Sequence, residues 1–127
     1  MPAILIVDDE YGIAEMSAEL LSYLSFTART ASDGASALTS VDQAPPDLIL
    51  LDVMMPVVSG IDVLLTLKAD ERHRDIPVVM MSAAGPEVIP DELRPLIAGF
   101  LLKPFTFDEL KKAVRTALPE AGSPSPS

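Results

Sequence analysis

Three acids, a hydroxyl and a lysine stand directly after short aliphatic runs in this 127-residue sequence. They are Asp8, Asp9, Asp52, Ser82 and Lys103. Carboxylates that are brought together repel one another and raise their pKa values, and a divalent cation relieves that repulsion. A lysine supplies a counter-charge to an acid, and a hydroxyl supplies a hydrogen bond. Any one of these residues is an ordinary loop residue, but the set predicts one polar site that handles negative charge.

These residues can meet only if the runs before them form neighbouring strands. Residues 48–51 read Leu-Ile-Leu-Leu, which fits a strand buried on both faces of a parallel sheet. Asp52 then stands at the carboxyl end of a central strand, where open α/β sheets bind their ligands. An acid there is costly without a partner, so we expect its partners at the ends of the other strands.

Hydrophobic runs and helical patterns alternate along the whole chain. We expect strands over residues 3–7, 27–31, 47–51, 77–81 and 100–102, and helices over residues 10–24, 35–41, 61–69 and 105–118. Asp9 is the expected N-cap of the first helix. Residues 85–98 contain three prolines, which predict a short or broken helix with Pro90 in its first turn. The alternation predicts right-handed βαβ units and a three-layer α/β fold.

The composition excludes several classes of protein. The apolar fraction of 49% excludes general disorder, and no apolar run approaches the roughly 18–20 residues of a membrane span. The N-terminus shows no secretory pattern, and without cysteine there are no disulfides or thiolate metal sites. The net charge of -10 disfavours direct nucleic-acid binding. We expect a cytoplasmic protein with one domain over residues 1–118 and a disordered Pro/Ser-rich tail over residues 119–127.

Over about residues 3–118 the sequence resembles the receiver domains of two-component response regulators. The motifs that carry the resemblance are Asp8-Asp9, Leu51-Asp52-Val53-Met54-Met55-Pro56, Met81-Ser82-Ala83 and Lys103-Pro104-Phe105. Each motif alone is a weak signal, but all four in this order and spacing are specific. The resemblance implies a flavodoxin-like, doubly wound (βα)5 fold whose five-stranded parallel sheet has the order 2-1-3-4-5.

The resemblance also assigns roles in phosphoryl transfer. It implies that Asp52 is the phosphoacceptor and that Lys103 pairs first with Asp52 and then with a phosphoryl oxygen. By the same pattern Asp9, Asp52 and the backbone carbonyl of Met54 bind Mg²⁺ (or Mn²⁺) directly, and Asp8 acts mainly through water. Mg²⁺ is a hard cation that takes oxygen ligands, which suits this set.

Three further positions carry implied structural or switching roles. Ser82, helped by the backbone N–H of Ala83, would hydrogen-bond the phosphoryl group. Phe100 stands where the family carries its switch aromatic, so its ring would turn when Ser82 moves. The Lys103–Pro104 peptide bond would be cis, and an ordinary trans proline at a helix start is the alternative.

The implied function is a signalling switch and not an enzyme that acts on a separate substrate. A histidine kinase or phosphotransfer protein would donate the phosphoryl group, and the surface formed by residues 85–118 would control a downstream protein. A dimer that depends on phosphorylation is also possible by the family pattern. No direct nucleic-acid contact and no membrane insertion are expected.

Three other interpretations stay open. The chain could be a receiver cut from a larger regulator or hybrid kinase. It could be an aspartyl-phosphate hydrolase, although those enzymes place Asp-x-Asp after the first strand and this chain has Asp8-Asp9-Glu10. A flavin-binding module is a third rival, but acids after the first strand would repel the flavin phosphate.

Two smaller expectations concern residues near the site and away from it. Met54 and Ala84 cannot orient a water by a strong hydrogen bond, so we expect slow loss of the phosphoryl group without a partner. His73 is the only histidine, and its charged surroundings predict a solvated loop residue.

Overall fold

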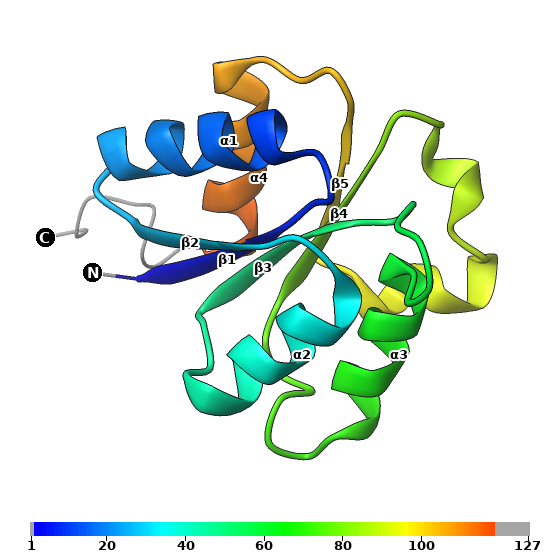
Figure 1. The fold of residues 1–127 in the computed structure, drawn as a ribbon. Helices are drawn as coiled ribbons and strands as arrows, with labels where there is room; N and C mark the ends of the chain where they lie inside the picture. The colour runs from blue at the N-terminus through cyan, green and yellow to red at the C-terminus, as the bar shows by residue number, and fades with distance from the viewer. Residues whose placement is uncertain (1, 119–127) are drawn as a thin grey trace, which may run out of the picture.

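The computed structural model describes residues 2–118, which alternate between strands and helices (Figure 1). The elements are β1 (Ala3–Val7), α1 (Tyr11–Tyr23), β2 (Thr27–Ala31), α2 (Gly34–Gln43), β3 (Leu48–Asp52), α3 (Gly60–Ala69), β4 (Val78–Ser82), β5 (Gly99–Leu102) and α4 (Phe107–Ala117). Two short 3₁₀ segments, η1 (Pro86–Val88) and η2 (Asp91–Leu96), lie between β4 and β5. The tail expected over residues 119–127 lies outside the described residues.

All five strands pair in parallel in the order β2-β1-β3-β4-β5, which confirms the expected sheet. Every residue of β3 and of β4 is buried, because helices cover the sheet on both faces. The first two strands begin and end where the sequence predicts them, and the other three differ by one residue at one or both ends. Asp52 is therefore the last residue of β3 itself and not the first residue of the following loop.

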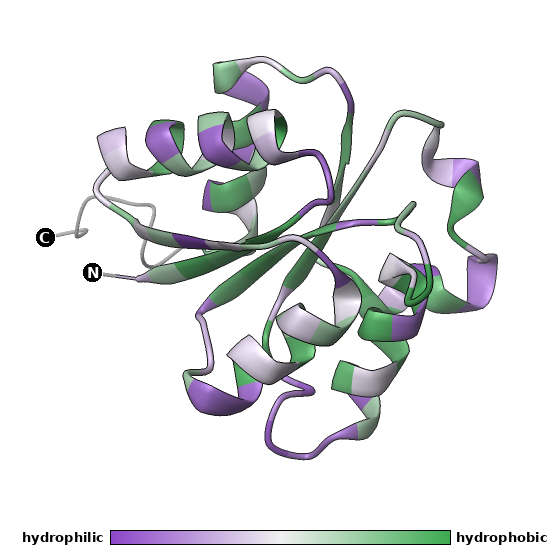
Figure 2. Cartoon of the chain, in the orientation of Figure 1, coloured by the Kyte–Doolittle hydropathy of each residue, from purple (hydrophilic) through white to green (hydrophobic). Residues whose placement is uncertain are grey.

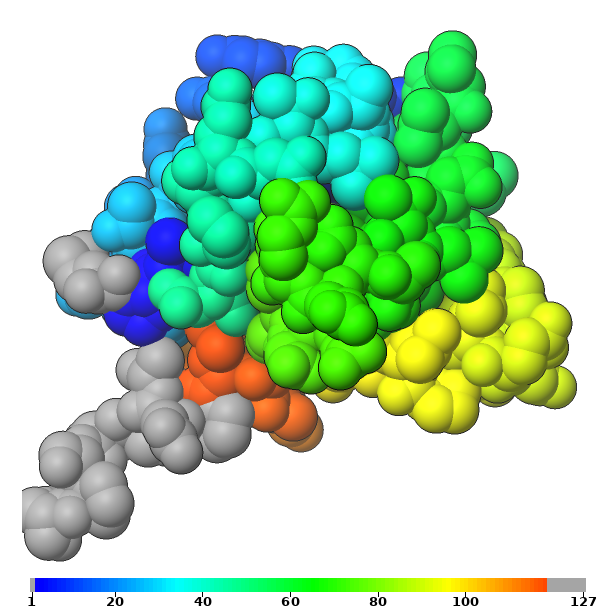
Figure 3. Space-filling model, turned by 90° about the horizontal axis from the view of Figure 1, so that it is seen from below, coloured from blue at the N-terminus to red at the C-terminus, as the bar shows by residue number. Residues whose placement is uncertain are grey.

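Two hydrophobic cores hold the three layers together, one on each face of the sheet (Figure 2). One core packs α1 and α4 against the sheet through residues such as Leu21 and Leu110. The other packs α2 and α3 against the opposite face through residues such as Val41 and Leu64. On that face α2 and α3 lie side by side, as Figure 3 also shows. Alternate side chains of each strand enter opposite cores, which fixes the strand register.

Side-chain caps explain where most of the helices begin. Asp33 accepts a hydrogen bond from the backbone N–H of Ser36 at 2.7 Å, and Ser59 and Thr106 each form a capping box. The prediction that Asp9 caps α1 is wrong, because Glu10 occupies the N-cap position without a side-chain hydrogen bond. The Asp8 carboxylate accepts from the Glu10 backbone N–H at 2.9 Å, so the chain turns into the helix one residue later.

The proline-rich segment between β4 and β5, where the sequence predicts a short or broken helix, forms two 3₁₀ segments and no α-helix. It folds into η1 and η2, with Pro90 as the N-cap of η2, one residue before the predicted position, and Pro95 inside η2. Proline lacks the backbone N–H that an α-helix needs, and 3₁₀ turns are used in such short pieces.

Within residues 2–118, no helix has the length and apolar character needed to cross a membrane.

Gly60 allows α3 to start against the end of β3. Its backbone N–H donates to the carbonyl of Val53 at 3.0 Å. A Cβ placed on Gly60 would lie 2.8 Å from Val53 Cα and would collide with the carbonyl oxygen of Asp52. No side chain fits there without moving the backbone that carries Asp52.

Gly60→Ala should therefore lower the free energy of unfolding by roughly 1–3 kcal/mol, because the new methyl group overpacks fixed backbone atoms. Chemical denaturation measures the change. Gly12→Ala is the matched control, since a Cβ at Gly12 meets nothing within 4 Å and should stabilise α1 by about 0.5–1 kcal/mol. If the two variants had equal free energies of unfolding, the close approach of Gly60 to the backbone of Asp52 and Val53 would be contradicted.

Candidate functional site

The carboxyl ends of the parallel strands bring three acids together. Asp8 and Asp9 follow β1, and Asp52 ends β3, which is the neighbouring strand. Each of these acids offers a carboxylate oxygen, and the three oxygens lie within 4.8 Å of one another. Asp8 and Asp52 are buried, whereas Asp9 is exposed at the mouth of the cluster. The predicted convergence of these acids is therefore present.

Lys103 is the cation of this cluster. Its Nζ lies 2.7 Å from Asp8 Oδ2, 3.4 Å from Asp52 Oδ2 and 3.5 Å from Glu10 Oε1. The resemblance implied a pair with Asp52, but the shortest contact is with Asp8. The contribution of Glu10 was not foreseen, although its place as the third acid after β1 was a signal for it.

Burial dominates the electrostatics of Asp52. The side chain is only 3% exposed, and this desolvation raises the pKa of Asp52 from 3.8 to about 6. Two groups lower the pKa of Asp52: the charged Lys103, and the Met54 backbone N–H, which donates to Asp52 Oδ1 at 3.3 Å. The negative charge of Asp8 raises the pKa further. The positive charge of Lys103 therefore offsets only part of the effect of burial on the pKa of Asp52.

The ammonium of Lys103 is held in its charged form. Burial by itself lowers the pKa of Lys103, but the short ion pair with Asp8 and the charge of Asp52 together raise the pKa above its usual value. One positive charge therefore lies next to the three carboxylates of Asp8, Asp52 and Glu10. The cluster keeps excess negative charge.

The residues present fit a hard divalent cation. All donors among Asp8, Asp9 and Asp52 are carboxylate oxygens, which suit Mg²⁺. Asp8 Oδ2 is buried and, apart from its ion pair with Lys103, has no well-oriented hydrogen bond among the described residues. The raised pKa of Asp52 is a second sign that a cation would relieve the cluster.

The other predicted site residues lie around this cluster. Ser82 ends β4 with its side chain buried, and its Oγ accepts a hydrogen bond from the Ala84 N–H at 3.0 Å. Phe100 lies half-buried on β5 against the α2–α3 core. The Lys103–Pro104 peptide bond is cis, as the resemblance implied. The roles of the Met54 carbonyl and the Ala83 N–H stay predictions.

His73 contradicts the prediction of a solvated loop residue. The residue is only 4% exposed, and its Nδ1 lies 3.4 Å from Asp70 Oδ2 and 3.8 Å from Asp42 Oδ1. The loop after α3 folds back on itself, because the backbone N–H groups of His73 and Arg74 both donate to the Asp70 carbonyl. The charged residues of the loop indicated solvent exposure, but the turn that the loop forms buries the His73 ring.

Comparison with known proteins agrees with this geometry. The family model described as response regulator receiver domain matches residues 4–115. The chain belongs to this family. Receiver domains of response regulators interact with kinases and with downstream targets, and the family binds Mg²⁺.

Solved structures and curated relatives resemble this receiver domain over nearly its whole length. The chemotaxis response regulator CheY4 of Vibrio cholerae is 29% identical with a TM-score of 0.85, over 92% of this chain and 98% of that one. The response regulator TrrA of Thermotoga maritima, solved in complex with Mg(2+)-BeF, is 31% identical with a TM-score of 0.82, over 92% of this chain and 99% of that one.

One curated relative is the DNA-binding dual master transcriptional regulator RpaA of Synechocystis. It is 38% identical over 121 residues, which are 93% of this chain and 49% of the relative. The receiver domain thus spans about half the length of the first curated relatives that it matches.

Asp52→Asn should stabilise the metal-free receiver domain. Because the folded-state pKa of about 6 exceeds the reference value of 3.8, the folded state holds the proton more tightly, and the stability contribution of Asp52 falls as pH rises between these values. Above pH 6 the substitution should raise the free energy of unfolding by about 1–3 kcal/mol, a gain that disappears below about pH 4.

Denaturant unfolding at several pH values in the presence of a chelator measures this effect. Glu71→Gln is the control, because Glu71 is exposed and forms no ion pair within the described residues. If the free energy of unfolding had the same pH dependence in the wild type and in Asp52→Asn, the raised pKa of Asp52 would be contradicted.

Proposed function

We propose that this receiver domain accepts a phosphoryl group on Asp52 from a histidine kinase or phosphotransfer protein in a Mg²⁺-dependent reaction. The observation that supports this most strongly is a buried carboxylate at the end of a central strand, with two further acids within 4.8 Å and a lysine ammonium at 3.4 Å. Such a site has excess negative charge and favours a metal ion. The Asp52 carboxylate faces Lys103, whose positive charge can balance the negative charge of an incoming phosphoryl group.

The proposed transfer is an in-line displacement at phosphorus. An oxygen of ionised Asp52 forms the new P–O bond, and the P–N bond to the donor histidine breaks, with its electron pair returning to the imidazole. With a pKa of about 6, Asp52 is mostly ionised at neutral pH. Lys103 then pairs with a phosphoryl oxygen, because catalysis of phosphoryl transfer rests mainly on positioning and on neutralisation of charge.

Mg²⁺ would be held by Asp9, Asp52 and the backbone carbonyl of Met54, with Asp8 acting through water. When bound, it neutralises charge on the phosphoryl oxygens. Mn²⁺ prefers similar oxygen ligands and could replace it in a test. The complex of TrrA with Mg(2+)-BeF supports the choice of Mg²⁺.

The proposed output runs through β5. Phe100 lines two hollows, one of about 220 Å³ against η1 and η2 and one of about 440 Å³ against α4. These hollows give the half-buried ring room to change position when Ser82 turns toward a phosphoryl group. The surface formed by η1, η2, β5 and α4 would then shift between two states and control a downstream protein or a phosphorylation-dependent dimer.

The wider setting of the domain is also proposed. We infer a cytoplasmic protein that catalyses only its own phosphorylation and dephosphorylation. The net charge of -10 argues against direct nucleic-acid contact by this domain. The DNA-binding relatives, of which the chain spans about half, support an alternative in which this receiver is part of a larger regulator.

Incubation with a small-molecule acyl-phosphate donor and Mg²⁺ tests the proposed reaction. We expect stoichiometric incorporation of phosphate into the wild-type protein, and none into Asp52→Asn or in the presence of a chelator. Asp9→Asn should still incorporate phosphate but require more Mg²⁺. Incorporation that is unchanged in Asp52→Asn would disprove the assignment.

The phosphorylated protein should lose its phosphoryl group slowly. Met54 and Ala84 are both exposed beside the site, and neither side chain can hold a water by a strong hydrogen bond. We expect a lifetime of minutes or longer, shortened in Met54→Gln, whose amide can orient water. Loss of ³²P label after removal of donor measures the lifetime, and a wild-type lifetime of seconds would contradict this expectation.

A further inference from the structure

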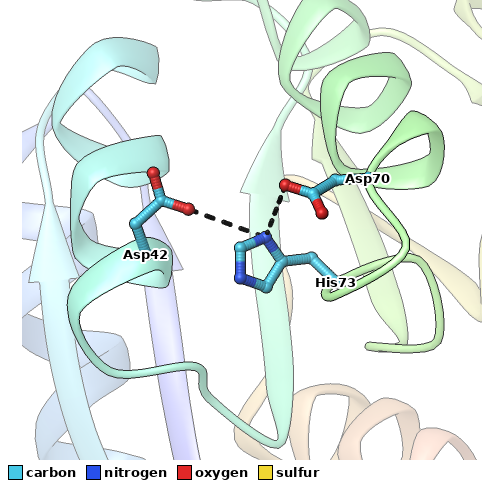
Figure 4. Close-up of side chains that lie close together, drawn as sticks. All are labelled: Asp42, Asp70 and His73. Carbon is cyan, nitrogen blue, oxygen red and sulfur yellow. Dashed lines mark ion pairs between the residues drawn. The ribbon is translucent and has the colours of Figure 1, made fainter.

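A second cluster of metal-ligating side chains lies at the opposite edge of the sheet from Asp52. His73 sits between Asp42, in the last turn of α2, and Asp70, the C-cap residue of α3 (Figure 4). The ring nitrogen Nδ1 and one carboxylate oxygen from each acid lie within 4.8 Å of one another. Three segments, the ends of two helices and a loop, therefore converge on one point.

Both acids lie at the carboxyl ends of helices, where positive charge is favoured. The carboxyl end of a helix carries partial negative charge, so an acid there is unfavourable and a cation is favourable. α2 has no basic residue in its last turn, and the cation at its end is Arg29 of β2, which donates to the Ser40 and Ala44 carbonyls and does not contact Asp42. Lys68 in the last turn of α3 is used elsewhere, because its Nζ donates to the carbonyls of Arg74 and Ile76.

The His73 ring is buried, and no side chain or carbonyl within residues 2–118 makes a hydrogen bond of normal length to it. Its Nδ1 is 3.4 Å from Asp70 Oδ2 and 3.8 Å from Asp42 Oδ1, both beyond the usual 2.7–3.2 Å of an N–H···O bond. Two ligands of a tetrahedral zinc ion stand about 3.3 Å apart when the metal–ligand bonds are about 2.0 Å long. The observed separations are therefore closer to those of ligands that share a metal.

We propose that His73 Nδ1 and the carboxylates of Asp42 and Asp70 form a site for Zn²⁺. Zinc binds histidine nitrogen and carboxylate oxygen, and sites with three protein ligands, such as two histidines and one glutamate, keep water in the fourth position. The imidazole makes the site unlike the cluster around Asp52, whose donors are oxygens alone and suit Mg²⁺. A hollow of about 220 Å³, lined by all three residues, adjoins the cluster.

Arg72 takes the place of a metal ion in this structure. Its Nη2 lies 2.8 Å from Asp70 Oδ2 and 3.3 Å from Asp42 Oδ1, the same two oxygens that face the His73 ring. The Arg72 side chain is 67% exposed, so it can leave when a metal binds. Zn²⁺ and Arg72 thus compete for one pair of carboxylates.

Zinc titration followed by NMR of the imidazole tests this site directly, because His73 is the only histidine of the chain. Excess Mg²⁺ is added to compete with Zn²⁺ for the carboxylates around Asp52. We expect one equivalent of Zn²⁺ to shift the His73 ring resonances. Arg72→Ala should bind several-fold more tightly, since the competing guanidinium is gone.

Asp42→Asn should weaken zinc binding by at least roughly 10-fold, because even outer partners of a metal site have effects of that size. Asp42 is 55% exposed, so this variant is expected to fold. Glu71→Gln, in the same loop, should bind like the wild type. Ring resonances that zinc leaves unchanged in both the wild type and Arg72→Ala, or equal zinc affinity in Asp42→Asn, would overturn the proposal.

Discussion

Two buried carboxylates that share one lysine form the interaction on which the rest of this structure depends. Asp8 and Asp52 end or follow adjacent strands, so the sheet forces their charges together, and Lys103 reaches both from the end of β5. One ammonium cannot fully compensate this cluster, and burial raises the pKa of Asp52 to about 6. Under the proposed function, the same shortage of positive charge would favour binding of a cation and of a phosphoryl group.

The strand β5 links this charged cluster to the surface that would read it. Phe100 and Lys103 lie three residues apart, the first half-buried between two hollows and the second in contact with the acids. The adjoining segment forms two 3₁₀ turns where the prolines exclude a helix. A partner of this receiver domain would therefore meet a surface of different shape from one built on a regular helix.

The sequence was sufficient for the sheet and for the acids at its edge, because continuous aliphatic runs leave few alternatives to buried parallel strands. Contacts between distant segments were not readable in the same way. The preference of Lys103 for Asp8 and the close approach of Gly60 to β3 depend on backbone positions that no local pattern encodes. His73 was misjudged because composition reports the character of a loop, whereas burial depends on how that loop packs against α2.

The most direct test of the central claim is to locate the phosphoryl group by chemical trapping. Borohydride reduces an acyl phosphate to an alcohol, so a phosphorylated aspartate becomes homoserine, which peptide mass spectrometry can assign to one position. After reaction with an acyl-phosphate donor and Mg²⁺, homoserine should be found at residue 52. Homoserine at residue 8 or 9, or phosphorylated protein in which residue 52 remains aspartate after reduction, would contradict the account.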